Sequence, residues 1–271
     1  MIPMIASKFQ LVPAHWIKIA ALAASLAFVA PTGAAGATPD DAKDILKKMT
    51  DYIAAQKNVS AKYDSDIEVV TTQGQKISFA SSGKILIQRP DKLRASRTGG
   101  YSDVDMVFDG KTLSILGKNL NSYTQIDAPG SLGKLVETIR DRTDVALPAA
   151  DLFSSTAYAD LTSDLTSAQH IGRGVVGGVE CEHLAFRTAD VDWQLWVQLG
   201  PNPIPRKYVI TSKQVTGAPQ YTVEFDDWQT DVPVAADSFT FTPPAGASKV
   251  AASDLRKENE VPGGVVIAAR K

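Results

Sequence analysis

The chain has 271 residues, of which 44% are hydrophobic and 21% are charged, and its formal net charge is −2 at pH 7. This composition is typical of a globular protein and excludes a chain that is disordered, collagen-like or coiled coil throughout. A charge so close to zero argues against a nucleic-acid-binding protein, which needs a basic face to meet phosphates. A single cysteine excludes an intramolecular disulfide, and three histidines give little support to a metal site.

Residues 1–37 have the features of a secretory signal peptide. They contain two lysines and no acidic residue, and the apolar stretch Ile19–Ala30 has the length of a signal-peptide core. The small residues of Ala35–Ala37 then match a signal-peptidase site, so we predict cleavage after Ala37 and export to the periplasm. The alternative is an uncleaved membrane anchor, which the short apolar run disfavours.

The mature chain is expected to be soluble and to carry a net charge of −4. The only cysteine, Cys181, lies deep in the chain, so no cysteine follows the apolar stretch where a bacterial lipoprotein would be acylated. No second long apolar run follows, and we therefore predict no transmembrane segment in the mature chain.

The first half of the mature chain predicts one helix followed by strands. Residues 40–57 carry apolar side chains at helical spacing, and Asp40 or Asp41 is a candidate cap. The hydrophobic period then changes to two, and Asp109-Gly110 is a strong hairpin signal. The expected strands are 59–69, 77–87, 93–97, 103–108, 113–116 and 123–126.

The second half predicts a helical insert and a second group of strands. Residues 132–142 and 149–152 look helical, whereas 156–167 form a polar stretch with no predicted element. Strands are expected near Gln169 and over 179–186, 191–199, 206–211, 221–225 and 239–241. Trp196 interrupts the polar face of its strand, which indicates either a second contact surface or, preferably, a position beneath a helix.

These elements predict a single mainly β (α+β) domain over residues 38–250, with about ten strands, an N-terminal helix and a helical insert. Residues 251–271 are polar or small and have no period, so we predict a flexible tail.

Four local patterns invite a chemical interpretation, and each has a better structural one. Residues 172–177 spell G-x-G-x-x-G, but a strand pattern follows where a nucleotide-binding helix should begin, and Gly177-Gly178 suits a hairpin turn. Asp226-Asp227 are neighbours that point to opposite faces of a strand unless a bulge intervenes, so solvated charge is preferred to a carboxylate dyad. The prolines at 201, 203 and 205 indicate a stiff loop more than a polyproline ligand.

The fourth pattern joins the lone cysteine to two histidines. Cys181 and His183 share a face of their predicted strand, and His170 is near in sequence. These residues are therefore candidates for a metal cluster or for a Cys-His nucleophile pair. A small buried thiol and half-exposed imidazoles are the preferred interpretation. We predict no metal, no cofactor and no catalytic residues.

Several segments jointly resemble an uncharacterised family of predicted periplasmic bacterial proteins, over about Asp41 to Ser248. The segments are Arg89–Arg94, Phe108–Leu113, Cys181–Arg187, Val191–Val197, Pro203–Thr211, Pro219–Thr222, Phe225–Trp228 and Phe239–Pro244. That family is similar in architecture to the lipoprotein carriers LolA and LolB and to the periplasmic sensor RseB. The resemblance implies a curved antiparallel half-barrel with helices lidding its concave face, and it implies acyl chains held between sheet and lid.

The expected function is therefore non-catalytic binding or carriage of a lipid, acyl chain or lipoprotein. The alternative is an RseB-like envelope-stress sensor or regulatory module that binds a partner protein, such as a membrane-bound one. An apolar stripe of the second strand group is long enough to line the cavity, although the same residues could simply pack the helices against the sheet. The expected lining residues are Trp193, Leu195, Val197, Tyr208, Ile210, Tyr221, Val223 and Phe225.

Overall fold

The computed structural model describes residues 39–143, 149–254, 261, 262, 265 and 267. All described residues belong to one compact unit, Ala37–Lys271. The predicted signal peptide and its cleavage site lie outside the described residues, as does much of the predicted tail. Within the part of the chain that is described, no helix is long and apolar enough to cross a membrane.

The N-terminal helix α1 (Pro39–Ala55) confirms the helix predicted from the first apolar period. Asp40 and Asp41 lie in its first turn, where negative charge is favourable against the helix dipole. Leu46, Met49 and Ile53 are fully buried, so one face of α1 belongs to the core. The helix ends at Ala55, and β1 begins at Asn58.

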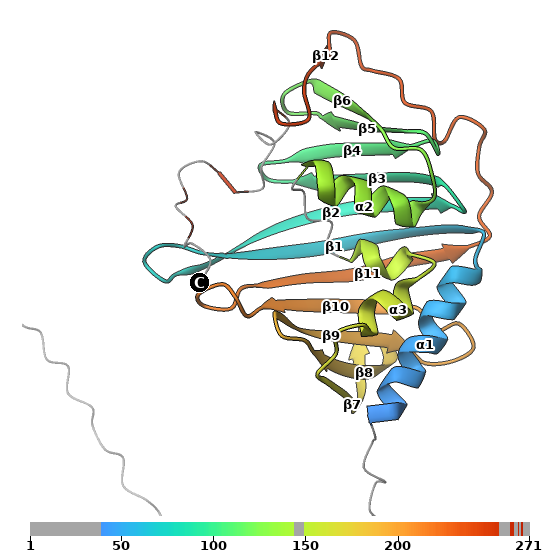
Figure 1. The fold of residues 1–271 in the computed structure, drawn as a ribbon, viewed down its shortest axis with the longest axis vertical. Helices are drawn as coiled ribbons and strands as arrows, with labels where there is room; N and C mark the ends of the chain where they lie inside the picture. Colours follow the sequence, from blue (N-terminus) through green and yellow to red (C-terminus); the bar gives the residue numbers. More distant parts are fainter. Residues whose placement is uncertain (1–38, 144–148, 255–260, 263–264, 266, 268–271) are drawn as a thin grey trace, which may run out of the picture. The chain divides into compact units, whose positions relative to one another are not determined.

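In the described part of the chain, twelve strands form one sheet in the order β12-β6-β5-β4-β3-β2-β1-β11-β10-β9-β8-β7 (Figure 1). Two antiparallel meanders meet where β1 pairs with β11, and β12 adds to β6 in parallel. The first meander comprises β1 (Asn58–Val70), β2 (Lys76–Gln88), β3 (Lys92–Gly99), β4 (Asp103–Phe108), β5 (Thr112–Gly117) and β6 (Ser122–Asp127). The second comprises β7 (Ser167–Val176), β8 (Val179–Arg187), β9 (Val191–Gln198), β10 (Pro205–Ser212) and β11 (Gln220–Thr230), and β12 is Ser248–Lys249.

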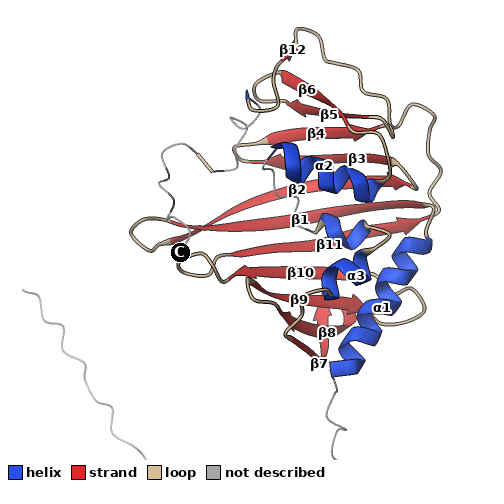
Figure 2. Ribbon diagram, in the orientation of Figure 1, coloured by secondary structure: helices blue, strands red, loops and turns tan. Residues whose placement is uncertain are grey.

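The helical insert connects the two meanders and lies with α1 over one face of the sheet (Figure 2). It consists of α2 (Leu132–Thr143), the 3-10 helix η1 (Ala150–Phe153) and α3 (Ala157–Thr162). We call the covered face the inner face and the opposite one the outer face. The core lies between the inner face and the helices, where Leu152 and Leu195 are both fully buried. The mainly β architecture with helices over one face of a curved open sheet is therefore confirmed.

One predicted strand is absent, and two short elements were not predicted. Residues 239–241 form no strand: Phe239 is buried and Phe241 packs on Tyr123 with ring centroids 5.4 Å apart, but Pro243 and Pro244 follow and have no N–H for a ladder. Helix α3 was missed inside a polar stretch, and the two-residue β12 was not expected.

The glycine-rich stretch in β7 and its turn is structural, as predicted. Gly177 and Gly178 both have positive φ, at 55° and 79°, as a type I′ hairpin turn requires. The turn joins β7 directly to β8, so no helix N-terminus follows the G-x-G-x-x-G pattern.

Candidate functional site: the apolar row of the inner face

One row of apolar side chains crosses six strands of the sheet on its inner face. Strand register places each member directly opposite the next, from β8 through β9, β10, β11 and β1 to β2. Adjacent strands are about 4.8 Å apart, so the row is about 24 Å long. We call this set the apolar row, and its members in order are Phe186, Trp193, Ile210, Tyr221, Ile67 and Phe79.

The apolar row runs from the helix-covered core into a partly exposed region. Phe186 and Trp193 are each only 3% exposed, and α1 packs over the strands that carry them. The other four members are partly exposed. A hydrophobic surface therefore continues beyond the helices instead of ending with the core.

The structure places all eight predicted lining residues on the inner face, but in two different environments. Ile210 and Tyr221 belong to the partly exposed end of the apolar row. The other six have at most 4% of their surface exposed and are part of the core: Trp193, Leu195, Val197, Tyr208, Val223 and Phe225. In this conformation only Ile210 and Tyr221 of the eight are open to a ligand.

Aromatic contacts fix the buried end of the row. The Phe186 and Trp193 rings stack with centroids 3.9 Å apart, and Tyr208 meets Trp193 edge-on at 5.8 Å. On the next strand, Phe225 meets Phe153 of η1 edge-on at 6.0 Å. Burial raises the pKa of Tyr208 well above its usual value, with the Asp151 charge adding to the effect, so its phenol stays neutral.

A pocket of about 350 Å³ lies at the other end of the row. It is lined by residues 77–80 of β2 and by the β3–β4 turn, residues 99–102. Phe79 and Tyr101 meet edge-on across it with centroids 5.9 Å apart, and Tyr101 is 55% exposed. The volume is at the lower end of the range of about 300–1,000 Å³ for small-molecule sites.

Ile67, Phe79 and Tyr101 extend the candidate site beyond the residues predicted from the sequence. Ile67 and Phe79 were visible as apolar positions of two strands. Their alignment with Ile210 and Tyr221 depends on β1 pairing with β11, which lies more than 150 positions away in the chain. Only this long-range register reveals the row.

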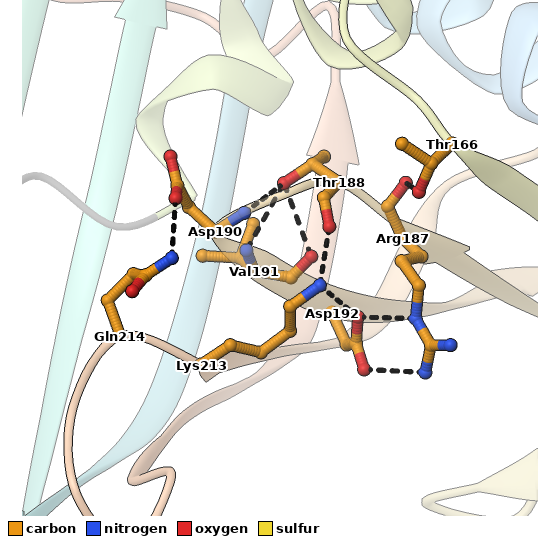
Figure 3. A network of polar contacts seen from close by, with 8 residues as sticks. All are labelled: Thr166, Arg187, Thr188, Asp190, Val191, Asp192, Lys213 and Gln214. Atoms are coloured by element: carbon orange, nitrogen blue, oxygen red, sulfur yellow. Dashed lines mark hydrogen bonds and ion pairs between the residues drawn. The ribbon is translucent and has the colours of Figure 1, made fainter.

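Polar contacts fix the strand ends next to Phe186, Trp193 and Ile210 (Figure 3). The Thr188 hydroxyl accepts hydrogen bonds from the backbone of Asp190 and Val191 in the β8–β9 turn. Arg187 donates two hydrogen bonds of 2.9 Å to Asp192, and Lys213 lies 3.3 Å from the same carboxylate while donating to the Thr188 carbonyl. The β8–β9 turn is thereby tied to the loop that follows β10.

The lone cysteine and the histidines do not form a site. Cys181 is fully buried and burial raises its thiol pKa, whereas His183 bonds to Gln194 at 3.0 Å. His170 lies in register with Leu184 on the inner face, where its Nε2 is 2.6 Å from Glu182. Among the described residues, no group of three or more His, Cys, Asp or Glu side chains could hold a metal ion.

Asp226 and Asp227 lie at a β-bulge, the one arrangement in which the sequence allowed the two carboxylates to act together. Lys62 pairs with Asp226 and Ser60 with Gln229 in the strand register, so Asp227 falls within the irregularity. Asp227 binds Lys62 at 2.8 Å, which lowers its pKa, while Asp226 lies 3.5 Å from Arg206. Each carboxylate meets its own cation and the pair is not a dyad.

Trp196 does not lie beneath a helix, contrary to the preferred interpretation of its position. It is on the outer face, where its ring stacks on His183 with centroids 4.0 Å apart, and Lys207 Nζ lies 5.7 Å from its ring centroid. The strand alternation that buries Trp193 turns Trp196 outward, and neighbouring outer-face side chains cover it instead.

The chain matches the family model of DUF2092, described as predicted periplasmic protein, over residues 42–252. It belongs to the DUF2092 family. This match confirms the predicted family and the predicted periplasmic location of the protein.

This DUF2092 protein is also similar to the outer-membrane lipoprotein carrier protein of Methylibium petroleiphilum. The two are 26% identical over 227 residues, which cover 80% of this chain and 93% of the relative. The predicted likeness to lipoprotein carriers is thus borne out in sequence.

Solved structures that align with the DUF2092 protein share little sequence with it. An uncharacterized conserved protein from Thermus thermophilus aligns with a TM-score of 0.47 and 10% identity, covering 78% of this chain and 98% of that one. LprF from Mycobacterium bovis aligns with a TM-score of 0.45 and 11% identity, covering 74% and 97%.

Proposed function

We propose that this periplasmic protein is a non-catalytic carrier that binds the acyl chain of a lipid or lipoprotein along the apolar row. The observation that carries the proposal is the continuity of the row from the buried Trp193 to the partly exposed Ile210, Tyr221, Ile67 and Phe79. An acyl chain lying along these side chains would remove its own apolar surface and theirs from water.

The energetics suit an extended apolar ligand. Burying one methylene group contributes about 0.8 kcal/mol, so a chain of a dozen carbons binds without a polar anchor. Two polar side chains of the inner face next to the row, the buried hydroxyls of Ser65 and Ser81, bond to each other at 2.9 Å. They offer a bound acyl chain no unpaired polar group.

The likeness to the Methylibium petroleiphilum protein supports the same proposal, because that relative is named as an outer-membrane lipoprotein carrier. A ligand that also contacted Trp193 and Leu195 would have to displace the helices, since both side chains are buried beneath them. We therefore propose Ile210 and Tyr221 as the first residues that a ligand meets.

Native mass spectrometry after gentle purification tests the proposal directly, with bound lipid as the expected result. A titration with 11-(dansylamino)undecanoic acid then measures affinity for an acyl probe. Ile210→Asn is expected to weaken the probe about tenfold or more, whereas Ile210→Val retains it. Val175→Asn is the matched control, since Val175 is 67% exposed on the edge strand β7.

Two results would overturn the proposal. One is the repeated absence of lipid together with no saturable binding of the probe. The other is probe binding that Ile210→Asn and Val175→Asn weaken equally, because the apolar row would then have no special role.

A further inference from the structure

The β1–β2 hairpin extends past its neighbours on both sides. β2 pairs with β1 along all of Lys76–Gln88, but β3 begins to pair with it only at Ser81. In the described part of the chain, Lys76–Ala80 therefore have no strand on their second side, and Figure 1 shows the hairpin projecting beyond β3. Five residues of strand edge are left open.

The peptide groups that face this edge follow from the alternation of an antiparallel pair. The Thr71 N–H donates to the Gln75 carbonyl at 2.8 Å, so every second residue of β2 from Gln75 onward bonds to β1. The remaining residues, Lys76, Ser78 and Ala80, direct their N–H and C=O groups away from β1. These groups match a polypeptide backbone and have no counterpart in an acyl chain.

The other side of the hairpin is already covered. The tip of β1 forms an antiparallel bridge between Thr71 and Ile267, and Gly217 approaches the Val70 side chain so closely that an added Cβ would lie 3.0 Å from it. The edge at Lys76–Ala80 is the one that stays open, among the described residues of this hairpin.

Side chains along the open edge define what would bind there. The pocket between Phe79 and Tyr101 adjoins the edge on its apolar side, and Gly100 leaves it room because an added Cβ would meet nothing within 4 Å. On the outer face, the small side chain of Ala80 lies opposite Asp66, which receives a hydrogen bond of 3.3 Å from Ser78 and has no ion pair in the described structure.

We propose that the edge at Lys76–Ala80 binds an extended segment of another polypeptide as an added β-strand. Its apolar side chains enter the pocket at Phe79 and Tyr101, and a basic side chain on its other face reaches over Ala80 to Asp66. The preferred segment therefore alternates apolar and basic residues. This site lies at the Phe79 end of the apolar row, away from Ile210 and Tyr221, the residues that an acyl chain is proposed to meet first.

The test uses the synthetic peptide acetyl-Lys-Val-Lys-Val-Lys-Val-Lys-amide and isothermal titration calorimetry with the full mature chain. We expect saturable binding with one peptide per protein. Ser78→Pro removes an edge N–H without touching the ladder to β1, and it should weaken binding about tenfold or more. Ser78→Ala keeps the N–H and is the matched control, and Asp66→Asn should weaken binding and reduce its salt dependence.

A fully N-methylated peptide of the same sequence keeps the side chains but cannot donate to a strand, so it should not bind. The proposal is overturned if this peptide binds as well as its parent, if a folded Ser78→Pro variant binds normally, or if wild type binds neither peptide. The dansyl fatty acid titration distinguishes this failure from failure of the carrier proposal, since Asp66→Asn changes only an outer-face side chain and should leave acyl binding unchanged.

Discussion

Gly83 lies directly beneath the ring of Tyr63, and a side chain at position 83 would overlap both that ring and the Ser96 carbonyl. Tyr63 donates a hydrogen bond of 3.1 Å to the same carbonyl, so its ring spans β2 and reaches β3. The absence of a Cβ at one strand position thus lets an aromatic side chain from β1 bind two strands away.

We expect Gly83→Ala to destabilise the protein by about 1–3 kcal/mol, because the methyl group forces the Tyr63 ring or the backbone of β3 to shift. Gly100→Ala is the control, since an added Cβ there meets nothing within 4 Å. Urea unfolding followed by tryptophan fluorescence measures both. Equal stabilities for the two variants would contradict the close packing of Tyr63 on Gly83.

Trp193 and Ile210 are neighbours in the apolar row, but they should respond differently to truncation. Trp193→Ala removes a buried ring that stacks on Phe186, so we expect a loss of about 3–5 kcal/mol. Ile210→Ala removes a partly exposed side chain and should cost only about 1–2 kcal/mol. Chemical denaturation measures the loss of stability in each variant, and the acyl-probe titration is run on the same two proteins. The prediction is contradicted if Ile210→Ala is the more destabilising change.

The sequence was informative wherever local period determines structure. The alternation through Trp193, Leu195 and Val197 predicted both β9 and its buried face, and the apolar spacing of α1 did the same for the helix. Phe239 was misjudged because an isolated aromatic residue in coil leaves the same signal as a short strand. Its burial depends on packing against distant residues, such as Lys92, whose Nζ lies 5.9 Å from the ring centroid.

The candidate site was less predictable than the fold. Apolar strand positions were identified, but whether a side chain is core or open depends on where the helices end over the sheet. Ile210 and Leu195 carry similar signals in sequence, yet one is partly exposed and the other is fully buried. The open edge of β2 exists because β2 is longer than β3. The residues of β2 are themselves no guide to where β3 stops pairing with it.

Asp192 should make stability depend on pH at acidic values. The hydrogen bonds from Arg187, with a contribution from Lys213, lower the pKa of this carboxyl. A carboxyl with a lowered folded pKa stabilises the protein above its unfolded pKa of about 3.9, and that contribution is lost as the pH falls through the folded pKa. Arg187 is 61% exposed, so solvent screening limits the effect to about 0.5–1 kcal/mol.

Asp192→Asn should therefore lower stability at pH 7 and flatten the dependence of stability on pH below about 4. Asp237→Asn makes the same charge change at an exposed carboxylate that has no ion pair in the described structure, and it should do neither. Urea unfolding between pH 7 and 2.5 measures both variants. A wild-type pH profile for Asp192→Asn would show that the Arg187–Asp192 pair contributes nothing.

The Cys181 thiol should not react with thiol reagents in the folded protein. Its side chain is fully buried, and burial raises the thiol pKa, so little thiolate forms near pH 8 and none of it is accessible. We expect no reaction of the native protein with 5,5′-dithiobis(2-nitrobenzoic acid) over minutes and one equivalent released in guanidinium chloride. A Cys181→Ser, Val175→Cys double variant moves the thiol to a position that is 67% exposed and should react at once. Rapid labelling of native wild type would mean that the packing around β8 opens readily, because reagent can reach Cys181 only through such an opening.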